Sequence, residues 1–325
     1  MSSGFWSQRQ MVAASFAKRR YRIRLTVVAF TCFAGFFLGL QKRSRLRSFY
    51  FFEVIQDVVL IMARYAILSD IHSNLEALNT VLEKCRQEGI TEYICLGDVV
   101  GYNANPNECI DLVKGLNLIA RVRGNHDDYA IRGNTAESGF NSNARRAVEW
   151  TREQISEENR KWLDDAEYEL KLPGVTLVHS TLDTPSNWGY ILDQFHAEDN
   201  FTYQRTNLCF CGHSHVPLAF VKKQLTAPGE RPIEIINSWS GDDDDDYSVP
   251  GVITVEYRKN NKYLFNVGSI GQPRNGDPRA SFVIWDNEKM SMSRYCLPYD
   301  LSLTQEKILE AGLPQRLADR LGSGS

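Results

Sequence analysis

Short apolar runs recur along the chain after residue 62, and five of them lead into a polar motif. Each of these five runs has four residues and lies close to Gly, Asp or Asn, a pattern typical of buried β-strands. The runs cover residues 65–68, 93–96, 119–122, 175–178 and 208–211. Because ligands collect at the carboxyl ends of strands in open α/β sheets, we expect the five motifs to meet at one rim.

Segments with apolar side chains at helical spacing lie between these runs, at residues 74–87, 107–115 and 143–154. The alternation of strand and helix predicts a largely parallel sheet. A second group of apolar runs follows residue 217, at 219–221, 251–255, 263–267 and 281–285. This later group predicts a second, mixed sheet that packs on the first.

The five polar motifs contain five of the six histidines of the chain. They read Asp70-Ile71-His72, Gly97-Asp98, Gly124-Asn125-His126-Asp127, Val178-His179-Ser180 and Gly212-His213-Ser214-His215. Carboxylate, imidazole and amide groups are suited to holding the divalent ions that activate phosphates. A single zinc needs about four ligands, and a structural zinc favours thiolates. The surplus of nitrogen and oxygen ligands therefore predicts two ions that share one ligand.

Each motif taken alone has an ordinary structural interpretation. Asp-x-His and Gly-Asp pairs are common by chance, residues 212–215 are also typical of a turn after a strand, and His179 could be a core histidine. The five motifs together, each after a predicted strand, favour a metal site over these separate explanations. The sixth histidine, His196, lies in a polar stretch and is expected at the surface.

With these motifs the chain resembles the calcineurin-like metallophosphoesterases, in particular their small prokaryotic phosphodiesterase and phosphatase branch. The resemblance covers about residues 62–321 and implies an α/β fold, a four-layer α-β-β-α sandwich of two mixed sheets flanked by helices. It also implies a role for each motif. One metal would be held by Asp70, His72 and His215, the other by Asn125, His179 and His213, with Asp98 bridging and His126 facing the leaving group.

Such a centre has a defined hydrolytic chemistry. Two divalent ions about 4 Å apart lower the pKa of a bridging water, so that hydroxide is available near neutral pH for in-line attack on a phosphoester. His126 could protonate or hydrogen-bond the departing oxygen, and Asp127 could orient its imidazole. Asp98, His126 and Asp127 are therefore the catalytic candidates. Manganese is the first expectation for the ions, with Fe, Ni, Co and Zn as alternatives that tolerate the same ligands.

The sequence identifies the substrate only as a class of compounds, the phosphoesters. Protein Ser/Thr phosphatases of the wider superfamily carry an Asp-Arg-Gly continuation after the bridging aspartate, whereas Val-Val follows Asp98 here. Phosphodiesters, small phosphomonoesters and nucleotides stay open, with Asn141, Arg145 and Arg274 as candidate substrate contacts. The first two could equally cap the following helix, and Arg274 could belong to an ordinary glycine-rich turn.

The N-terminal 61 residues differ from the rest of the chain. They hold ten Lys or Arg against two acids, about +8, which leaves −11 for the remainder of a chain whose formal net charge is −3. Residues 25–40 form an apolar run, short for a spanning helix of about 20 residues. Three interpretations of this segment stay open: a membrane anchor, a signal peptide, and an extension upstream of a true start at Met62. We expect a cytoplasmic protein that starts at Met62, with anchoring through residues 25–40 as the alternative.

The remaining features fit one catalytic domain over residues 62–302, after the extension 1–61. Residues 303–325 predict a C-terminal helical segment whose last four residues are expected to fray. The seven cysteines have no Cys-x-x-Cys spacing and are typical of reduced residues in a cytosolic protein. The five aspartates at 242–246 predict a solvated loop.

Other functions fit parts of the sequence. A non-catalytic scaffold of this fold would lack key ligands, and no expected ligand is missing here. A nuclease that acts on long nucleic acids would carry a basic surface, which the charge of −11 after residue 61 argues against. A protein or nucleotide phosphatase is a further alternative. We expect a small phosphoester or nucleotide as the substrate, while the oligomeric state is not determined by the sequence.

Overall fold

The computed structural model describes residues 63–133, 141–224, 232–240 and 246–325. The chain divides into two units, Met1–Gln56 and Asp57–Ser325, and all the described residues belong to the second. The predictions for the N-terminal extension, for the apolar run 25–40 and for aspartates 242–245 therefore lie outside the described residues. Among the helices within the described ranges, none has the length and apolar content of a membrane span.

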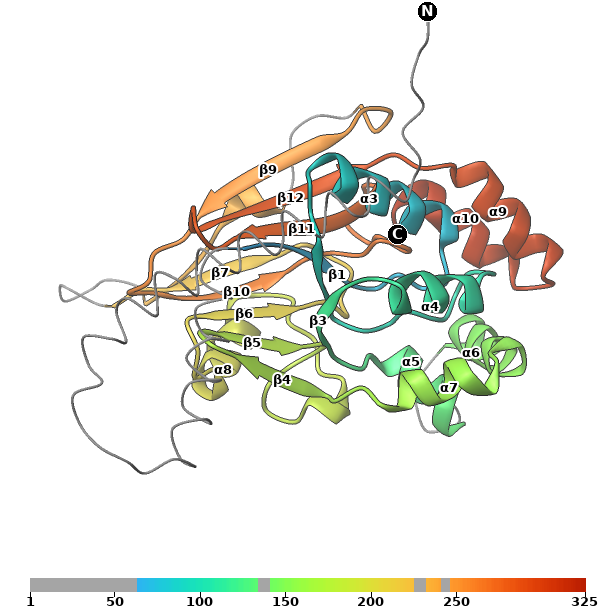
Figure 1. Ribbon diagram of the computed structural model, residues 1–325, viewed down its shortest axis with the longest axis horizontal. Coiled ribbons are helices and arrows are strands. Elements are labelled where there is room, and N and C mark those ends of the chain that lie inside the picture. Colours follow the sequence, from blue (N-terminus) through green and yellow to red (C-terminus); the bar gives the residue numbers. More distant parts are fainter. Residues whose placement is uncertain (1–62, 134–140, 225–231, 241–245) are drawn as a thin grey trace, which may run out of the picture. The chain divides into compact units, whose positions relative to one another are not determined.

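The first sheet has six strands in the order β3-β2-β1-β11-β12-β9 (Figure 1). β1, β2 and β3 are parallel to one another, whereas β11, β12 and β9 extend the sheet from β1 by antiparallel pairing. The strands are β1 Arg64–Leu68, β2 Glu92–Cys95, β3 Leu118–Arg121, β9 Gly251–Glu256, β11 Ala280–Asp286 and β12 Ser291–Leu297. All seven residues of β11 are buried, as expected for a strand in the interior of a sheet that is covered on both faces.

The second sheet has the order β4-β5-β6-β10-β7-β8. β5, β6 and β10 are parallel, and the outer strands pair in the antiparallel direction. The strands are β4 Glu169–Leu172, β5 Val175–Val178, β6 Leu208–Cys211, β7 Ala219–Lys222, β8 Ile233–Ile235 and β10 Lys262–Asn266. Both sheets are therefore mixed, with parallel strands beside antiparallel ones.

The prediction of two mixed sheets flanked by helices is confirmed, but the predicted assignment of strands to the sheets was wrong. The motif strands β5 and β6 belong to the second sheet, and the later strands β9 and β11 belong to the first. A short apolar run indicates that a strand is buried, but the choice of its neighbour depends on packing between segments distant in sequence. The apolar pattern alone could not distinguish the two pairings.

The helices begin where the sequence pattern places them, at α3 Leu75–Gln87, α4 Pro106–Lys114 and α6 Ser142–Gln154. Asn74 and Asn141 cap α3 and α6, since their side chains accept hydrogen bonds from the backbone N–H groups of Ala77 and Ala144. The other helices are α5 Asn125–Arg132, α7 Glu157–Asp164, α8 Gln194–Tyr203, α9 Leu301–Glu310 and α10 Gln315–Ser323, with short 3₁₀ helices η2 Pro185–Asn187 and η3 Asn237–Trp239.

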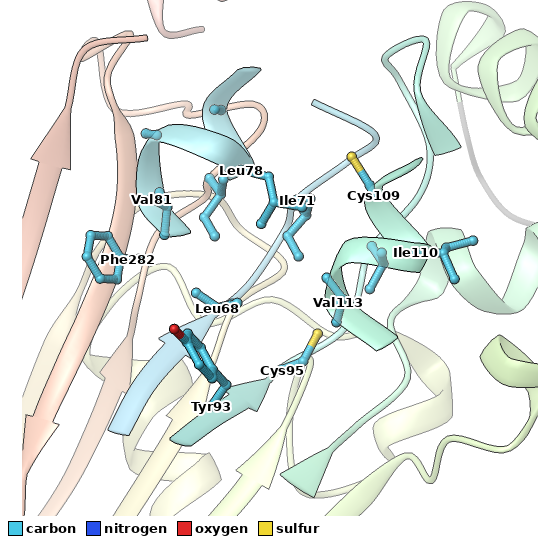
Figure 2. Packing of buried hydrophobic residues seen from close by; sticks show 14 of the residues in the cluster. Leu68, Ile71, Leu78, Val81, Tyr93, Cys95, Cys109, Ile110, Val113 and Phe282 are labelled. Carbon is cyan, nitrogen blue, oxygen red and sulfur yellow. The ribbon is translucent and has the colours of Figure 1, made fainter. Parts of the chain in front are cut away.

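Alternating side chains of the strands build three apolar layers. Ala66 and Leu68 of β1 face the cluster that α3 and α4 complete (Figure 2), whereas Tyr65 and Ile67 face the cluster between the sheets. Successive residues of a strand point to opposite faces, so β1 can contribute to both layers. In the second sheet, Phe210 of β6 packs between the sheets, and its neighbours on β6 pack with α8. The layers of the domain are therefore arranged in the order helices, first sheet, second sheet, helix.

The C-terminal helices pack on the domain through their own small cluster. Ile308 of α9 and Leu317 and Leu321 of α10 are buried together with Tyr102. The last residues do not fray as expected, because α10 continues to Ser323 and the Gly276 N–H donates a hydrogen bond to the Gly324 carbonyl. This packing brings α10 close to the loop that follows β2.

Candidate metal centre

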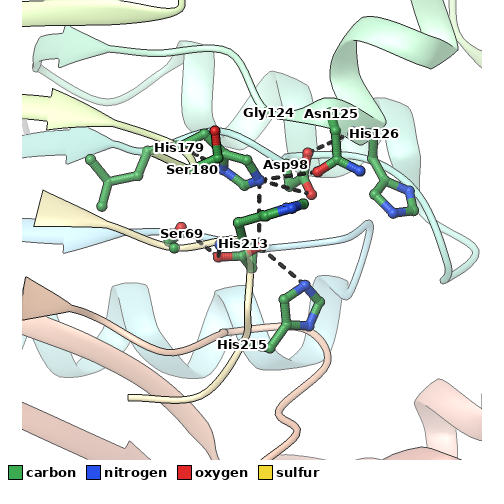
Figure 3. A network of polar contacts seen from close by, with 12 residues as sticks. Ser69, Asp98, Gly124, Asn125, His126, His179, Ser180, His213 and His215 are labelled. Atoms are coloured by element: carbon green, nitrogen blue, oxygen red, sulfur yellow. Dashed lines mark hydrogen bonds and ion pairs between the residues drawn. The ribbon is translucent and has the colours of Figure 1, made fainter. Parts of the chain in front are cut away.

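The motif residues lie at the carboxyl ends of strands from both sheets, around a common centre (Figure 3). Asp70 and His72 follow β1, Asp98 follows β2, Asn125 opens α5 after β3, His179 follows β5, and His213 and His215 follow β6. All seven side chains are buried. The predicted rim therefore forms, but two sheets rather than one supply it.

The backbone is strained at most of these positions. Positive φ angles occur at Asp70 (51°), His72 (49°), Asp98 (51°), His213 (67°) and His215 (61°). This left-handed region is uncommon for residues other than glycine and costs of order 1–3 kcal/mol at each residue. Strain concentrated on five of the seven predicted ligands indicates that the fold holds these side chains in position for a function.

Two motif glycines are explained by close approach of the carboxylates. A Cβ atom on Gly124 would overlap the Asp98 carboxylate and backbone nitrogen, and one on Gly212 would overlap the Asp70 carboxylate. Only glycine leaves room for both aspartates beside the neighbouring turns. The glycines of the motifs thus fix where the acidic ligands lie.

A first group of ligand atoms comes from Asp70, His72, Asp98 and His215, which lie within 4.8 Å of one another. The Asp70 Oδ1 atom is 3.2 Å from His215 Nε2 and 3.7 Å from His72 Nε2. The Asp98 Oδ2 atom is 3.6 Å from His72 Nε2. Donors at about 2.0–2.2 Å from one metal ion are about 3–3.5 Å apart, so these separations suit a single cation.

A second group comes from Asp98, His179 and His213, and it shares Asp98 with the first. The His179 Nε2 atom is 3.3 Å from Asp98 Oδ2 and 3.2 Å from Asn125 Oδ1. Asn125 therefore joins this group as an amide ligand candidate. The geometry brings together all seven predicted metal ligands in two groups with Asp98 between them.

The two aspartates each direct one unsatisfied oxygen into the centre. Asp70 Oδ2 accepts hydrogen bonds from the Ser69 hydroxyl at 2.6 Å and from the His213 N–H at 3.2 Å, and Asp98 Oδ1 accepts from the His126 N–H at 2.8 Å. The other oxygens, Asp70 Oδ1 and Asp98 Oδ2, are buried without a hydrogen-bond partner among the described residues. These two oxygens lie close to imidazole nitrogens, and a cation between carboxylate and imidazole would satisfy both, so the residues present fit a metal.

Backbone carbonyls fix the orientation of the four histidines. The Nδ1 atoms of His72, His179 and His215 lie 3.0, 2.8 and 2.6 Å from carbonyl oxygens, and His213 Nε2 lies 2.9 Å from another. A ring nitrogen that donates to a carbonyl leaves the other nitrogen unprotonated to bind metal. The Nε2 atoms of His72 and His215 then face each other at 3.0 Å with both lone pairs directed inward, an arrangement that a shared cation resolves.

The protonation states favour metal binding at most of the ligands. Burial lowers the pKa of His213 to about 4 and that of His215 to about 3, so both imidazoles are neutral at pH 7. Burial opposes ionisation of Asp98, but the charge and hydrogen bond of His179, together with the charges of His126 and His72, outweigh it and hold the Asp98 pKa below its ordinary value. Burial likewise opposes protonation of His179, and the Asp98 carboxylate still raises its pKa to about 9.

A cavity of about 200 Å³ opens beside the ligands. Its walls include the ligands Asp98, Asn125, His213 and His215, and further Tyr102, His126, Asn141, Ala144, Tyr190, Arg274 and Arg320. Two of the three predicted substrate contacts, Asn141 and Arg274, are thus on the wall. The third, Arg145, is exposed and does not line the cavity.

The two non-ligand catalytic candidates differ in their surroundings. The His126 ring lies 4.3 Å from the Tyr102 ring and 4.8 Å from the His72 ring, on the cavity wall. Asp127 accepts hydrogen bonds from the backbone N–H groups of Val99, Val100 and Gly124. Burial and the Asp98 carboxylate raise the Asp127 pKa to about 6. Through these hydrogen bonds Asp127 connects the loop that carries Asp98 with the turn that carries Asn125.

Sequence reasoning missed four cavity residues, Ala144, Tyr102, Tyr190 and Arg320. Tyr102 follows Asp98 by four positions, so its proximity to a ligand was the available signal. Tyr190 stacks on His213 with ring centroids 4.1 Å apart, and Arg320 lies on the C-terminal helix. No motif in the sequence connects these last two residues with the centre.

Comparisons with known proteins agree with this geometry. Residues 63–237 match the model of the calcineurin-like phosphoesterase superfamily domain. The uncharacterised protein MJ0912 of Methanocaldococcus jannaschii is 37% identical over 269 residues, 82% of this chain and 100% of that protein. A metallophosphoesterase structure from Sphaerobacter thermophilus has 34% identity and a TM-score of 0.65, over 81% of this chain and 100% of its own. Hypothetical protein PH1004 from Pyrococcus horikoshii OT3 shares the fold at 20% identity, with a TM-score of 0.62 over 81% and 99% of the two chains.

Proposed function

The chain belongs to the calcineurin-like phosphoesterase superfamily, and from this membership we propose that it is a dinuclear metal-dependent hydrolase of phosphodiesters or small phosphomonoesters. One observation carries the proposal: two ligand groups share Asp98, and the buried oxygens Asp70 Oδ1 and Asp98 Oδ2 have no hydrogen-bond partner among the described residues. Two divalent ions, when bound, supply Lewis acidity and an activated water for in-line displacement at phosphorus.

The side chains around the cavity supply the remaining functions. Arg274 and the amide of Asn141 bind the substrate from the cavity wall. Burial holds the pKa of His126 well below its ordinary value, so this imidazole is neutral and donates a hydrogen bond to the departing oxygen rather than a full proton. Asp127 positions the loops of Asp98 and Asn125 through its backbone contacts.

The same features rank the alternatives. A scaffold without catalysis has no need for seven converging ligands on a strained backbone, so the complete set favours an enzyme. The cavity of about 200 Å³ suits a small phosphoester or nucleotide better than a long nucleic acid. Manganese stays the first choice for the ions, with Fe, Ni, Co and Zn as alternatives, since the oxygen and nitrogen ligands accept all of them.

The proposal is tested by hydrolysis of bis-p-nitrophenyl phosphate and p-nitrophenyl phosphate. The full chain is stripped of metal and assayed with and without added Mn²⁺, beside Asp98→Asn and the exposed control Asp111→Asn. We expect turnover that requires Mn²⁺, survives in the control and is lost in Asp98→Asn. Metal binding without turnover of either ester would favour the scaffold instead.

A further inference from the structure

Two arginines from distant parts of the chain meet on the wall of the cavity beside the metal ligands. Arg274 lies in the loop after β10, and Arg320 lies on α10, which Leu317 and Leu321 anchor to the domain. The same cavity is lined by Asp98, where the two ligand groups meet. A substrate held at the metal centre therefore extends towards two guanidinium groups.

The hydrogen bonds of the two guanidiniums leave most of their donors available. Arg274 Nη2 donates to the Tyr102 hydroxyl at 3.1 Å and to Gln272 Oε1 at 3.0 Å, and Arg320 Nε donates to an oxygen of Ser325. Arg274 Nε is buried without a hydrogen-bond partner among the described residues. Both arginines are partly buried, and neither forms an ion pair with an Asp or Glu side chain in the described ranges. The buried Arg123 and Arg279, by contrast, each pair with an aspartate.

The two guanidiniums line the same cavity, so their positive charges oppose each other. Burial lowers the pKa of Arg320, and the positive charge of Arg274 lowers it further. Two cations on the wall of one cavity are unfavourable, and an anion bound between them would offset the repulsion. This arrangement is typical of sites that bind a phosphate, for which arginine offers two parallel donors.

Two polar groups beside the arginines can donate hydrogen bonds to a bound anion. The Tyr102 hydroxyl accepts from Arg274, so its own hydrogen is left to donate. The Asn141 carbonyl oxygen accepts from the Ala144 N–H, so its amide NH₂ group is likewise left to donate. Each therefore adds a donor to the cavity wall.

Resting on the proposed phosphoesterase function, we propose that Arg274 and Arg320 form a subsite for a second phosphoryl group of the substrate. The preferred substrates are then phosphoesters that carry a further phosphate, as nucleoside bisphosphates and related esters do. The metal centre takes the scissile phosphate, and the arginines take the other. Arg320 is the more informative of the two, because Arg274 is already proposed as a general substrate contact on the cavity wall.

The test compares two esters that share scissile bond and leaving group. Thymidine 5′-(p-nitrophenyl phosphate) is assayed beside the same ester with a 3′-phosphate, using the Mn²⁺-loaded full chain. We expect kcat/KM to be at least about 10-fold higher for the 3′-phosphorylated ester, mainly through KM, since charge-assisted hydrogen bonds from arginine to phosphate are among the stronger ones. Arg320→Gln should reduce this ratio to near one, and Arg320→Lys should restore part of it.

A matched control separates the subsite from net charge. Arg316→Gln removes the same charge from an exposed position on α10 that does not line the cavity, and it should leave the ratio unchanged. A binding measurement makes the test independent of turnover. Adenosine 3′,5′-bisphosphate should bind the Mn²⁺-loaded protein about 10-fold more tightly than adenosine 5′-monophosphate by calorimetry, and Arg320→Gln should abolish the difference.

The outcomes distinguish the two proposals. Two results would overturn the second-phosphate subsite and leave the proposed phosphoesterase activity intact. One is equal kcat/KM for both esters together with equal binding of both nucleotides. The other is a kcat/KM ratio between the two esters that Arg320→Gln does not change. Absence of hydrolysis of either ester, with tighter bisphosphate binding that depends on Arg320, would support the subsite and overturn the proposed activity.

Discussion

His126 lies on the cavity wall beside the ligands without belonging to either ligand group. Replacement by alanine removes a hydrogen-bond donor to the leaving group, and we expect turnover to fall about 100-fold, as for other single donors to developing charge. Metal content should be kept, because no ligand is lost. Elemental analysis and hydrolysis of bis-p-nitrophenyl phosphate check both expectations. His196→Ala, at an exposed histidine, is the control, and a parental rate in His126→Ala would exclude this role.

The buried cysteines give a second expectation for individual residues. Burial raises the pKa of Cys85 and of Cys95 to about 12, so both thiols stay protonated at pH 8 and are poor nucleophiles. In the native protein, iodoacetamide should leave both unmodified, whereas the unfolded chain should react fully. Peptide mass spectrometry after brief labelling measures each site separately. Rapid native labelling of either cysteine would show that its side chain is accessible.

The side chains that converge at the candidate metal centre could be picked out one by one in the sequence, because metal chemistry demands particular side chains, which stand out after apolar runs. Asp98 and His179 are examples, since each follows the last residue of a predicted strand closely. The cavity wall follows no such rule. Tyr190 and Arg320 reach the cavity through the packing of a loop and of α10, and neither position differs in the sequence from an ordinary surface residue.

The turn between β3 and α5 holds Asp98 in place through Gly124. A Cβ at this position would overlap the Asp98 carboxylate and its backbone nitrogen. We therefore expect Gly124→Ala to displace the shared ligand, with at least about 100-fold lower turnover and weaker metal binding, since displacements near 1 Å cost about that much. Gly115→Ala is the matched control, because the nearest atoms to its added Cβ lie at 3.4 Å or beyond. Equal activity of both variants would contradict the argument.

At the level of elements, most strands and the helices α3, α4 and α6 were predictable, but the strand order was not. The sequence pattern did not predict β4, β8, β12, α5, α7 and α8. Helical spacing and capping asparagines marked α3 and α6 closely, since these signals act within a few residues. The insertion of β11 between β1 and β12 depends on contacts across more than 200 residues. In β11, Val283 faces the layer between the sheets and Ile284 faces the layer under α3. A strand that is apolar on both faces buries its side chains equally well beside β1 or in the other sheet, so the apolar pattern does not select its neighbours.

In the whole molecule the candidate metal centre joins the two sheets. The loops after β1 and β2 of the first sheet supply Asp70, His72 and Asp98, and the loops after β5 and β6 of the second supply His179, His213 and His215. Without a cation, the two aspartate oxygens that lack a hydrogen-bond partner and the facing nitrogens of His72 and His215 oppose this approach of the sheets. Bound ions would therefore stabilise the packing of one sheet on the other, in addition to any catalytic function.

Metal removal should accordingly lower the thermal stability of the folded domain. At a free Mn²⁺ concentration 100 times the dissociation constant, one site adds about 2.7 kcal/mol to the free energy of unfolding, which corresponds to about 5–10 °C in Tm for a domain of this size. Thermal unfolding followed by circular dichroism, with EDTA or with Mn²⁺, measures the shift. Asp98→Asn should show a much smaller shift, because both ligand groups lose the same carboxylate. An identical Tm with EDTA and with Mn²⁺ would mean that the two sheets are held in this arrangement by their apolar layer alone.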